Sequence, residues 1–563
     1  MKKLRIFALL TALLLLLVSC SGTDDGTSPS QSPSSGTSAN TSSAPSDTPS
    51  ANTPDPFGKY EPGITVTSVR QTNAAATFAD GEDYENNIWT RLAQDELGIS
   101  MDYLWIAEGT DYSEKLNLLI GSNALPDILR VDATQLNQLV EFDMVEDLTD
   151  IWKEYADPWT VEDLSRDGGH MLQSGNYDGR MMGIPYIASK EDTAAMLWIR
   201  KDWLDKLNLD VPKSMQDVIE VARAFVNNDP NGNGQNDELG IGMNGGPLTG
   251  VVSFPPIGFH NSYHAYPGLW VKQADGTIGY GDIQPEFKQS LLAMRDLYAE
   301  GIIDPDFVGA DDTHLVEQLA QQRLGMFYSV YYISLMLQPA FEVDTGADWI
   351  IIPIQSIDSN PATPQVGAGA DNFYVVRKGY EHPEALVKLM NLTKKYGDGS
   401  AEHERYMYDE TGRFVAEYIP IPQGGFFNNM RSAQRVREYM KTGVEPESWV
   451  KEDMNNYNQV KGFADGNMAN WMLDRVFNPE TGSLVTMEAY VNGDLFERNA
   501  FYGVPPASVS EFMPILTDLE TQIIPQIVLG LKPPEAFDDF VAQWKSLGGD
   551  QITKDINEAM SNR

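Results

Sequence analysis

The chain has 563 residues, with 81 Asp and Glu against 40 Lys and Arg, so its formal net charge is −41. This charge repels phosphate backbones and excludes nucleic acid as an expected partner. It says little more about the ligand, because a solvated acidic surface is its ordinary explanation. A single cysteine leaves no pair for an intramolecular disulfide.

The first twenty residues have the features of an export signal that ends in a lipid attachment site. A basic start, residues 1–5, precedes a leucine-rich run that is too short to span a membrane. The sequence Leu17-Val18-Ser19-Cys20 resembles the lipobox of bacterial lipoproteins, in which the cysteine is acylated and becomes the new N-terminus. We expect residues 1–19 to be a lipoprotein signal peptide and Cys20 to hold the protein on the extracellular face of the cell membrane. The alternative is an ordinary signal peptide with an incidental cysteine.

A low-complexity segment follows, rich in Ser, Thr, Pro, Gly and Asn. It lacks the apolar side chains that would offset the entropy of ordering, so residues 20–60 are predicted to form a flexible stalk. About 500 residues remain, which is room for two or three domain-sized units.

The first part of the body alternates predicted strands with predicted helices. Residues 64–69 and 101–105 are β-rich runs, and residues 89–97 between them have helical character. A further helix around Leu116 precedes a third strand at residues 126–131. This alternation indicates an α/β fold with a parallel sheet.

A second set of elements follows residue 186. Residues 195–199 predict a buried strand, and a helix begins after Ser214, where Asp217 stands at capping-box spacing. Residues 287–298 form an amphipathic helix that ends at Gly301. Additional strands are predicted at residues 325–327, 349–352 and 373–376, and the chain after residue 501 is loop and then helix-rich.

Several of these segments, in this order and spacing, resemble one protein family over nearly the whole mature chain. The family is that of the extracellular solute-binding lipoproteins (family 1) of ABC transporters, in the oligosaccharide branch similar to alginate-binding proteins. The segments that carry the likeness, besides the lipobox, are residues 126–128, 183–186, 197–204, 501–506, 537–541 and 547–549.

The resemblance implies an α/β fold of the type II periplasmic-binding-protein kind, with two lobes and a ligand cleft between them. Lobe 1 is expected at residues 61–185 and 370–435, and lobe 2 at residues 186–369 and 436–563. Open α/β sheets bind ligands at their strand ends, which face such a cleft. The chain should cross between lobes near residues 183–189 and 367–371, and a third crossing is placed near residues 427–447.

The resemblance also implies a function. The protein is expected to be a monomeric binding protein that closes on an oligosaccharide and delivers it to the permease subunits of an ABC importer. An extracellular polysaccharide-active enzyme, such as a glycosidase with two carboxylates, is the main alternative. With 81 acidic residues a carboxylate pair can be found anywhere, and the sequence contains no Ser-centred elbow, phosphate loop or zinc helix motif.

Residues 229–238 form the sharpest local motif. Side-chain oxygens at alternate positions around glycines are typical of an EF-hand-type calcium loop, although Gly240 replaces the usual glutamate at the twelfth position. Oxygen ligands without His or Cys favour calcium over zinc, and we expect a structural ion. The alternative is a simple Asn/Gly/Asp turn. The predicted ligands are Asp229, Asn231, Asn233, Gln235 through its carbonyl, Asp237 and Glu238.

Sugar rings are bound by aromatic faces and by polar side chains. Aromatic residues outside regular periodicity, and polar residues at the expected crossings, are therefore the candidate substrate-binding residues: Tyr186, Trp270, Tyr331, Tyr332, Asp371, Asn372 and Trp471.

Overall fold

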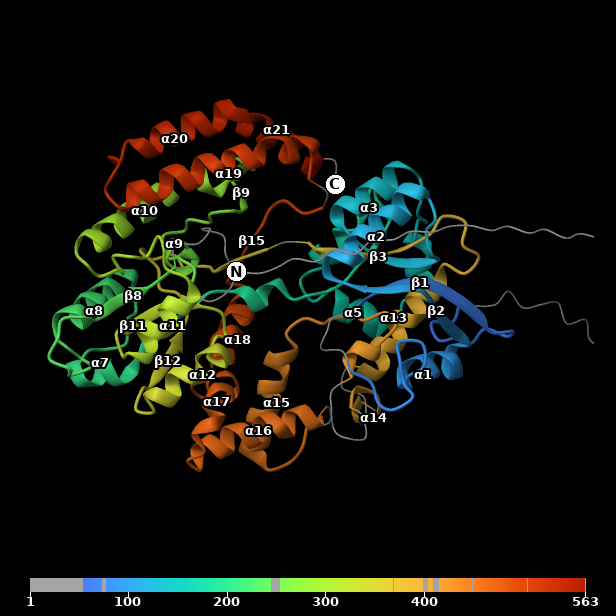
Figure 1. The fold of residues 1–563 in the computed structure, drawn as a ribbon, viewed down its shortest axis with the longest axis horizontal. Helices are drawn as coiled ribbons and strands as arrows, with labels where there is room; N and C mark the ends of the chain where they lie inside the picture. Colours follow the sequence, from blue (N-terminus) through green and yellow to red (C-terminus); the bar gives the residue numbers. More distant parts are fainter. Residues whose placement is uncertain are drawn as a thin grey trace, which may run out of the picture. The chain divides into compact units, whose positions relative to one another are not determined.

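The computed structural model describes residues 54–72, 77–244, 254–367, 369–397, 403–408, 415–446, 449–503 and 505–561 (Figure 1). The chain divides into two units, Met1–Thr53 and Pro54–Arg563, and all described residues belong to the second. Cys20 and most of the predicted stalk lie outside the described residues. Within them, no helix is long and apolar enough to span a membrane.

One set of strands builds the sheets of the first lobe. β1 (Ile64–Thr72) pairs in parallel with β2 (Ile99–Glu108), and β14 (Asn372–Val376) lies antiparallel between β3 (Ile128–Asp132) and β6 (Ile184–Pro185). The other elements in this part of the chain are α1 (Ile88–Leu97), α2 (Gly109–Ser122), α3 (Ala133–Glu141), α4 (Thr149–Tyr155), α5 (Pro158–Leu164), α6 (His170–Gln173), β4 (Asn176–Tyr177), β5 (Arg180–Met181), α13 (Glu384–Gly397), α14 (His403–Met407) and η3 (Ala416–Tyr418).

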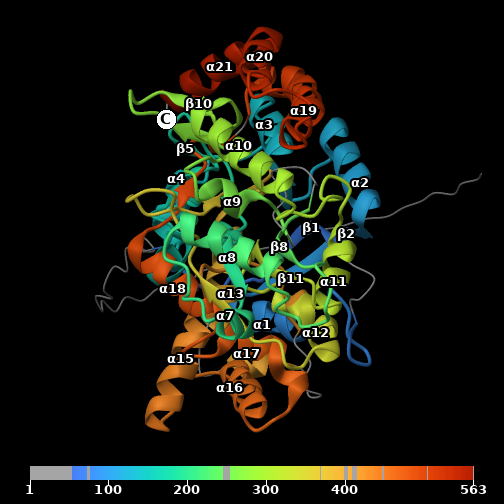
Figure 2. The ribbon, with the colours of Figure 1, turned by 90° about the vertical axis from the view of Figure 1, so that its left-hand side faces the viewer.

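A four-stranded sheet forms the second lobe. Its order is β12 (Trp349–Ile352), β7 (Met196–Arg200), β11 (Leu324–Ser329) and β8 (Leu239–Gly242). Helices α7 (Lys201–Leu207) and α8 (Met215–Asn227) lie beside this sheet (Figure 2). The other elements are η1 (Lys190–Thr193), α9 (Ile257–Asn261), the hairpin β9 (Trp270–Lys272) and β10 (Ile278–Tyr280), η2 (Gly281–Ile283), α10 (Pro285–Ala299), α11 (Asp312–Ala320) and α12 (Ser334–Val343).

The C-terminal third is mainly helical. α15 (Asn428–Thr442) packs on α16 (Lys451–Ala464) and α18 (Ser483–Gly493), and α17 (Trp471–Phe477) packs on α12 and α16. The last helices are α19 (Ala507–Val528), which packs on α10, α20 (Ala536–Trp544) and α21 (Asp550–Ser561). Short elements complete this part: η4 (Met468–Asn470), β15 (Glu497–Arg498) and the π-helical turn η5 (Lys545–Gly549).

Local signals in the sequence explain where several elements begin and end. The Ser214 hydroxyl accepts the backbone N–H of Asp217 at 3.1 Å and caps α8, as the capping pattern predicts. Gly301, directly after α10, has a φ of 72°, a left-handed conformation that glycine adopts without strain. The predicted strands at residues 195–199 and 373–376 are β7 and β14.

Both lobes depart from the parallel sheet that the alternating pattern predicts. β1 and β2 are parallel, but β7 is antiparallel to β11 and β12, and β14 is antiparallel to β3 and β6. β7 and β14 each follow a segment that comes from the other sheet, not a crossover helix on the same sheet. Neighbouring strands are parallel when a helical crossover connects them. Because β7 and β14 are not reached through such a crossover, they can pair antiparallel with their neighbours.

The strand order shows two places where the chain passes between the two sheets. Residues 186–195 lead from β6 to β7, and residues 367–371 lead from β13 (Gln365–Val366) to β14. β13 also pairs in parallel with β15, which brings residues 497–502 to the same region. Residues 186–195 and 367–371 are called the crossing segments below, and residues 497–502, which lead from α18 to α19, are called the β15 segment.

Two predicted boundaries need correction. Residues 54–60, predicted as the end of the stalk, belong to the body, because the Tyr60 hydroxyl donates to Glu384 at 2.7 Å and Lys388 lies 4.4 Å from the Tyr60 ring centroid. The predicted lobe boundary at residue 435 falls inside α15, and the predicted third crossing at residues 427–447 consists mostly of this continuous helix, which packs on α16 and α18.

Candidate ligand site at the crossing segments

The first lobe presents Tyr186 at the start of the first crossing segment. Its backbone N–H donates to the carbonyl of Asn372 at 2.9 Å, so the predicted residues Tyr186 and Asn372 are held together. The Arg130 guanidinium lies 5.3 Å from the Tyr186 ring centroid and donates to the Gln71 side chain at 2.9 Å. Tyr186 is half-buried, so part of its ring remains free to contact a ligand.

The second lobe presents a pair of tyrosines directly after β11. The rings of Tyr331 and Tyr332 are 5.1 Å apart in an edge-to-face arrangement. Tyr331 is buried, and its hydroxyl accepts a hydrogen bond from the Asn429 amide at 2.6 Å. Tyr332 is half-buried. Burial, and after it the nearby Asp192 carboxylate, raises the pKa of both phenols, so Asp192 belongs to the same cluster.

Asp192 is a carboxyl group in an unfavourable environment. Burial, and then the neighbouring Glu191, raises its pKa to about 7. At neutral pH it therefore exists in both protonation states, and it can accept or donate a hydrogen bond to a sugar hydroxyl.

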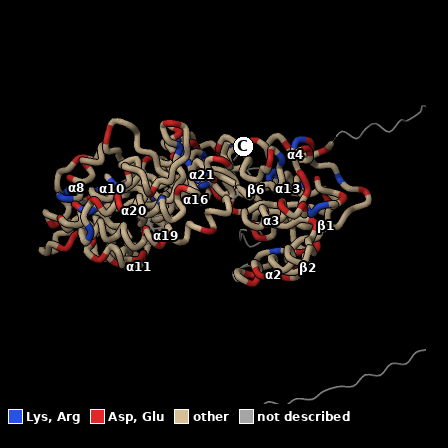
Figure 3. Tube along the Cα trace, turned by 90° about the horizontal axis from the view of Figure 1, so that it is seen from above, with Lys and Arg blue, Asp and Glu red and all other residues tan. Residues whose placement is uncertain are grey.

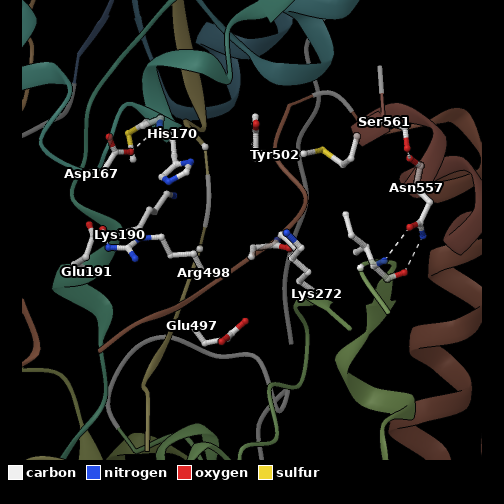
Figure 4. A pocket seen from close by; sticks show the side chains of 18 residues that line it. Asp167, His170, Lys190, Glu191, Lys272, Glu497, Arg498, Tyr502, Asn557 and Ser561 are labelled. Carbon is white, nitrogen blue, oxygen red and sulfur yellow. Dashed lines mark hydrogen bonds and ion pairs between the residues drawn. The ribbon is translucent and has the colours of Figure 1, made fainter. Parts of the chain in front are cut away.

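The residues before Asp192 face a different space. Lys190 and Glu191 line a cavity of ≈ 450 Å³ (Figure 4), a volume within the range of small-molecule sites. Lobe 1 contributes Asp167 to this cavity, the β9–β10 hairpin contributes Lys272, and the rest of its wall includes His170, Met171, Gly276, Ile278, Gly367, Gly369, residues 497–500, Tyr502, Asn557, Met560 and Ser561.

Ion pairs join the crossing segments at this cavity. The Lys190 ammonium lies 2.6 Å from the Asp371 carboxylate, which links the first crossing segment to the second. Arg498 lies 3.5 Å from Glu191, which links the β15 segment to the first crossing segment. Burial raises the pKa of Glu191, although Arg498 opposes that effect. The predicted residue Asp371 is itself exposed.

Two predicted aromatic residues lie in packed interiors. Trp471 is 2% exposed and stacks on Phe341 with ring centroids 4.4 Å apart. Trp270 is 5% exposed and packs on Tyr280 at 5.1 Å. The structure does not bring either indole to an open ring face at the crossing segments. Their polar neighbours in the sequence suggested exposure, but helix and hairpin packing covers the rings.

Sequence reasoning missed several residues of this region, above all Arg130, Asp192, Lys190, Arg498 and Tyr502. Arg130 and Tyr502 lie in or beside segments that carried the family likeness, so a signal was present. The pairing of residues far apart in sequence, such as Lys190 with Asp371, had no local pattern that could reveal it.

The predicted calcium loop connects α8 to β8. The Asp229 carboxylate accepts the backbone N–H groups of Gly232, Asn233 and Gly234 at 2.9 to 3.0 Å, which curls the loop around it. The Asn233 amide donates to Asp237 at 3.0 Å. No group of three His, Cys, Asp or Glu side chains with metal-ligating geometry occurs in the described part of the chain.

Glu238 is the residue of this loop that fits a cation best. It is 3% exposed, and neither carboxylate oxygen has a hydrogen-bond partner. Burial raises its pKa and outweighs the nearby backbone N–H groups of Glu238 and Asn231, and the charges of Asp229 and Asp237 act in the same direction as burial. A buried carboxylate without a partner, beside two other carboxylates, fits a divalent cation with oxygen ligands.

The sequence profile of the family described as bacterial extracellular solute-binding protein matches residues 75–393. The chain belongs to this family. The match spans more than half of the chain and includes both crossing segments and the predicted calcium loop.

Three characterised relatives are similar to this family member. The fructooligosaccharide ABC transporter substrate-binding protein FusA of Streptococcus pneumoniae is 27% identical over 278 residues, 46% of this chain and about half, 49%, of FusA. The polygalacturonan/rhamnogalacturonan-binding protein YtcQ of Bacillus subtilis is 24% identical over 82% of this chain and 85% of YtcQ. Lipoprotein LipO of the same organism is 22% identical over 82% of this chain and 86% of LipO.

Solved structures show that the two-lobed fold is shared. An extracellular solute-binding protein from Bifidobacterium longum subsp. infantis covers 90% of this chain and 99% of its own, at 15% identity and a TM-score of 0.58. The structure of FusA in complex with kestose covers 89% of this chain and 100% of its own, at 18% identity and a TM-score of 0.53. The alginate-binding protein AlgQ2 without calcium ion covers 90% of this chain and 99% of its own, at 14% identity and a TM-score of 0.51.

Proposed function

We propose that this solute-binding protein is the oligosaccharide-binding lipoprotein of an ABC importer, and that it binds its ligand without chemical change. The observation that carries the proposal is the pair of half-buried tyrosines, Tyr186 and Tyr332, that the two lobes present at the crossing segments. Ring faces of this kind pack on sugar rings, and the side chains of Arg130, Asp192 and Asn429 around them are hydrogen-bonding groups.

Binding in this arrangement depends on the crossing segments. Each one joins the two sheets, so a change in their backbone angles alters the angle between the lobes, which is how hinge closure traps a ligand. The closed, loaded protein would then be recognised by the permease subunits. The names of FusA and YtcQ, a fructooligosaccharide and a pectic-polysaccharide binder, support a carbohydrate ligand.

The test is calorimetry of the purified protein with a panel of oligosaccharides, followed by chromatography of the recovered ligand. A binding protein returns the ligand intact, with saturation at one ligand per chain. A shortened ligand would establish the alternative, a polysaccharide-active enzyme. Sedimentation in the same samples should show a monomer.

The proposed location is the extracellular face of the cell membrane, through a lipid on Cys20. The order of the basic start, the apolar run and the cysteine supports it. The name of the relative LipO, a lipoprotein, agrees with this location.

We also propose a structural calcium ion in the loop of residues 229–238. Glu238 supports it most strongly, because its buried carboxylate lacks a partner. Two similar solved structures, a FusA EF-hand mutant in complex with fructo-nystose and the alginate-binding protein AlgQ2 without calcium ion, support a site of this kind. Asp229, Asn231, Asn233, the Gln235 carbonyl, Asp237 and Glu238 would hold the ion, which would tie α8 to β8.

A further inference from the structure

A small cavity lies against the C-terminal half of β1 and the first three residues of β3, next to the Tyr186 side of the site. Its volume is ≈ 60 Å³. A cavity of this volume has room for a small group such as a carboxylate. Its wall consists of residues 68–71, Tyr103, Tyr112, residues 128–130, Tyr374 and residues 420–422.

Arg70 is the first of two guanidinium groups in this wall. It is 8% exposed, donates to the backbone carbonyls of Ile419 and Glu417, and lies 4.5 Å from the Tyr84 ring centroid. Its Nε–H is buried and has no hydrogen-bond partner. A buried cation that contacts only neutral groups, with one donor unused, is a costly arrangement unless an anion completes it.

Arg130 is the second guanidinium. It donates a hydrogen bond to the Gln71 side chain at 2.9 Å, and Tyr112 and Tyr374 lie near both arginines. Within the described residues, neither Arg70 nor Arg130 forms an ion pair, and no Asp or Glu lines the cavity. In a chain where acidic residues are twice as numerous as basic ones and occur all along the backbone (Figure 3), this absence of counter-charge is informative.

We propose that the cognate ligand carries a carboxylate, as an oligosaccharide of uronic acids does, and that Arg70 and Arg130 bind this group in the small cavity. The inference rests on the proposed function, because it names the chemical class of the oligosaccharide. Planar guanidinium groups match a carboxylate with two parallel hydrogen bonds, and such charge-assisted bonds are stronger than neutral ones.

Arg130 connects this cavity with the aromatic part of the site. The same guanidinium lines the cavity and lies over the Tyr186 ring. One sugar unit can therefore pack on Tyr186 while its carboxylate meets Arg130. A neutral hexose, with a hydroxymethyl group in place of the carboxylate, would leave both cations without a counter-charge.

The experiment compares acidic trisaccharides with their own methyl esters by calorimetry at low salt. The probes are trimers of galacturonic, glucuronic and mannuronic acid, each beside the ester, which keeps the ring and removes the charge. We expect at least one acid to bind at least tenfold more tightly than its ester, with an affinity that falls as NaCl rises.

Variants assign the effect to the cavity. Arg130→Gln should weaken binding of the acid roughly 10- to 100-fold and leave binding of the ester nearly unchanged, as expected for loss of hydrogen bonds to a charged group. Arg223→Gln removes the same guanidinium from α8, where it pairs with Glu300, and is the matched control, with at most a few-fold effect. Arg70→Lys keeps the charge but not the planar fork, and should weaken only the acid.

The outcomes separate this inference from the proposed function. Binding of neutral oligosaccharides or esters without preference for any acid would overturn the uronate assignment and leave the proposed function intact. Equal losses in Arg130→Gln and Arg223→Gln would overturn the assignment to this cavity. Failure of every oligosaccharide to bind would remove both proposals.

Discussion

Lys190 and Asp371 form an ion pair of 2.6 Å that joins the first crossing segment to the second. Both residues adjoin the segments where the chain passes between its two sheets, so the contact acts on the part of the molecule that sets the lobe angle. The pair is partly exposed, with 22% of the Lys190 side chain and 74% of the Asp371 side chain accessible.

A double-mutant cycle with Lys190→Gln and Asp371→Asn should therefore give a small coupling energy in urea unfolding, about 0.2–1 kcal/mol, because water screens exposed pairs. The coupling should shrink further in high salt. A coupling above about 2 kcal/mol would mean that the pair is shielded from water in solution, contrary to the exposure seen here.

Removal of the half-buried tyrosines should weaken ligand binding and leave the fold intact. Tyr186→Ala and Tyr332→Ala are each expected to cost about 1–3 kcal/mol of binding free energy in calorimetry, the scale for losing a large aromatic contact. Tyr332→Phe keeps the ring and should retain most of the affinity. Tyr298→Ala, on α10, is the control for loss of a half-buried tyrosine elsewhere, and an equal loss there would disprove the assignment.

Trp471 gives the opposite expectation. Its indole is buried and stacked on Phe341, so Trp471→Ala leaves a large cavity and should lower the free energy of unfolding by about 3–5 kcal/mol. Fluorescence or calorimetric unfolding would measure it. This contrast separates the aromatic residues that the structure brings to the crossing segments from those it uses in the core.

The sequence predicted the elements well because their signals are local. The cap at Ser214, the glycine after α10 and the β-rich runs of β1 and β14 each depend on residues within one turn or strand. The direction of each strand was harder to predict from the sequence, because it depends on whether the chain reaches the strand through a helix or from the other sheet.

The site was harder to predict than the elements for a related reason. Tyr186, Tyr331, Tyr332 and Asn372 were expected at the site and lie beside the crossing segments. Trp270 and Trp471 had the same sequence character, and only packing distinguishes them. Arg130 sits inside a strand that reads as core, and its contact with Tyr186 joins positions 56 residues apart, for which no spacing rule exists.

Asp192 should make stability depend on pH. Burial raises its pKa from the ordinary 3.8 of an aspartate to about 7 in the folded protein, so the folded state binds the proton more tightly than the unfolded state. The stabilisation is complete below the unfolded pKa and is lost as pH rises from about 4 to about 7. Asp192→Asn, which mimics the protonated acid, should therefore raise the free energy of unfolding at pH 8 by about 1–2 kcal/mol after allowance for partial exposure.

The measurement is urea unfolding of both proteins between pH 4 and pH 8. The difference between Asp192→Asn and the wild type should be small at pH 4 and reach its full size near pH 8. Burial also raises the pKa of Glu191, so some slope will remain in the variant. A constant difference across the range would show that Asp192 does not titrate in this window.

Cys20→Ala should release the protein from the membrane fraction or leave an uncleaved precursor. The thiol is the only one in the chain, so no other cysteine can accept the lipid. Metabolic labelling with a fatty acid, followed by fractionation, makes the measurement, and Ser21→Ala is a neighbouring control. A labelled Cys20→Ala protein would contradict the lipobox interpretation.

Calcium should stabilise the protein through Glu238. A ligand that binds only the folded state adds about 2.7 kcal/mol at a hundredfold excess over its Kd, so calcium should raise the Tm and chelation should lower it. Asp229→Ala should lose most of this shift because it removes both a proposed ligand and the centre of the loop's hydrogen bonds.

The variant Glu238→Gln distinguishes a bound metal ion from a simple turn. In chelator its stability should equal or exceed that of the wild type, because a neutral amide replaces a buried charge without a partner, while its response to calcium should nearly vanish. Glu300→Gln is the control. Glu300 forms a partly exposed ion pair with Arg223 and is outside residues 229–238, so this variant should keep the full calcium response. Two results together would contradict the calcium proposal: a wild-type Tm that chelation leaves unchanged, and a Glu238→Gln variant that is less stable than the wild type without calcium. The loop would then be held by protein contacts alone.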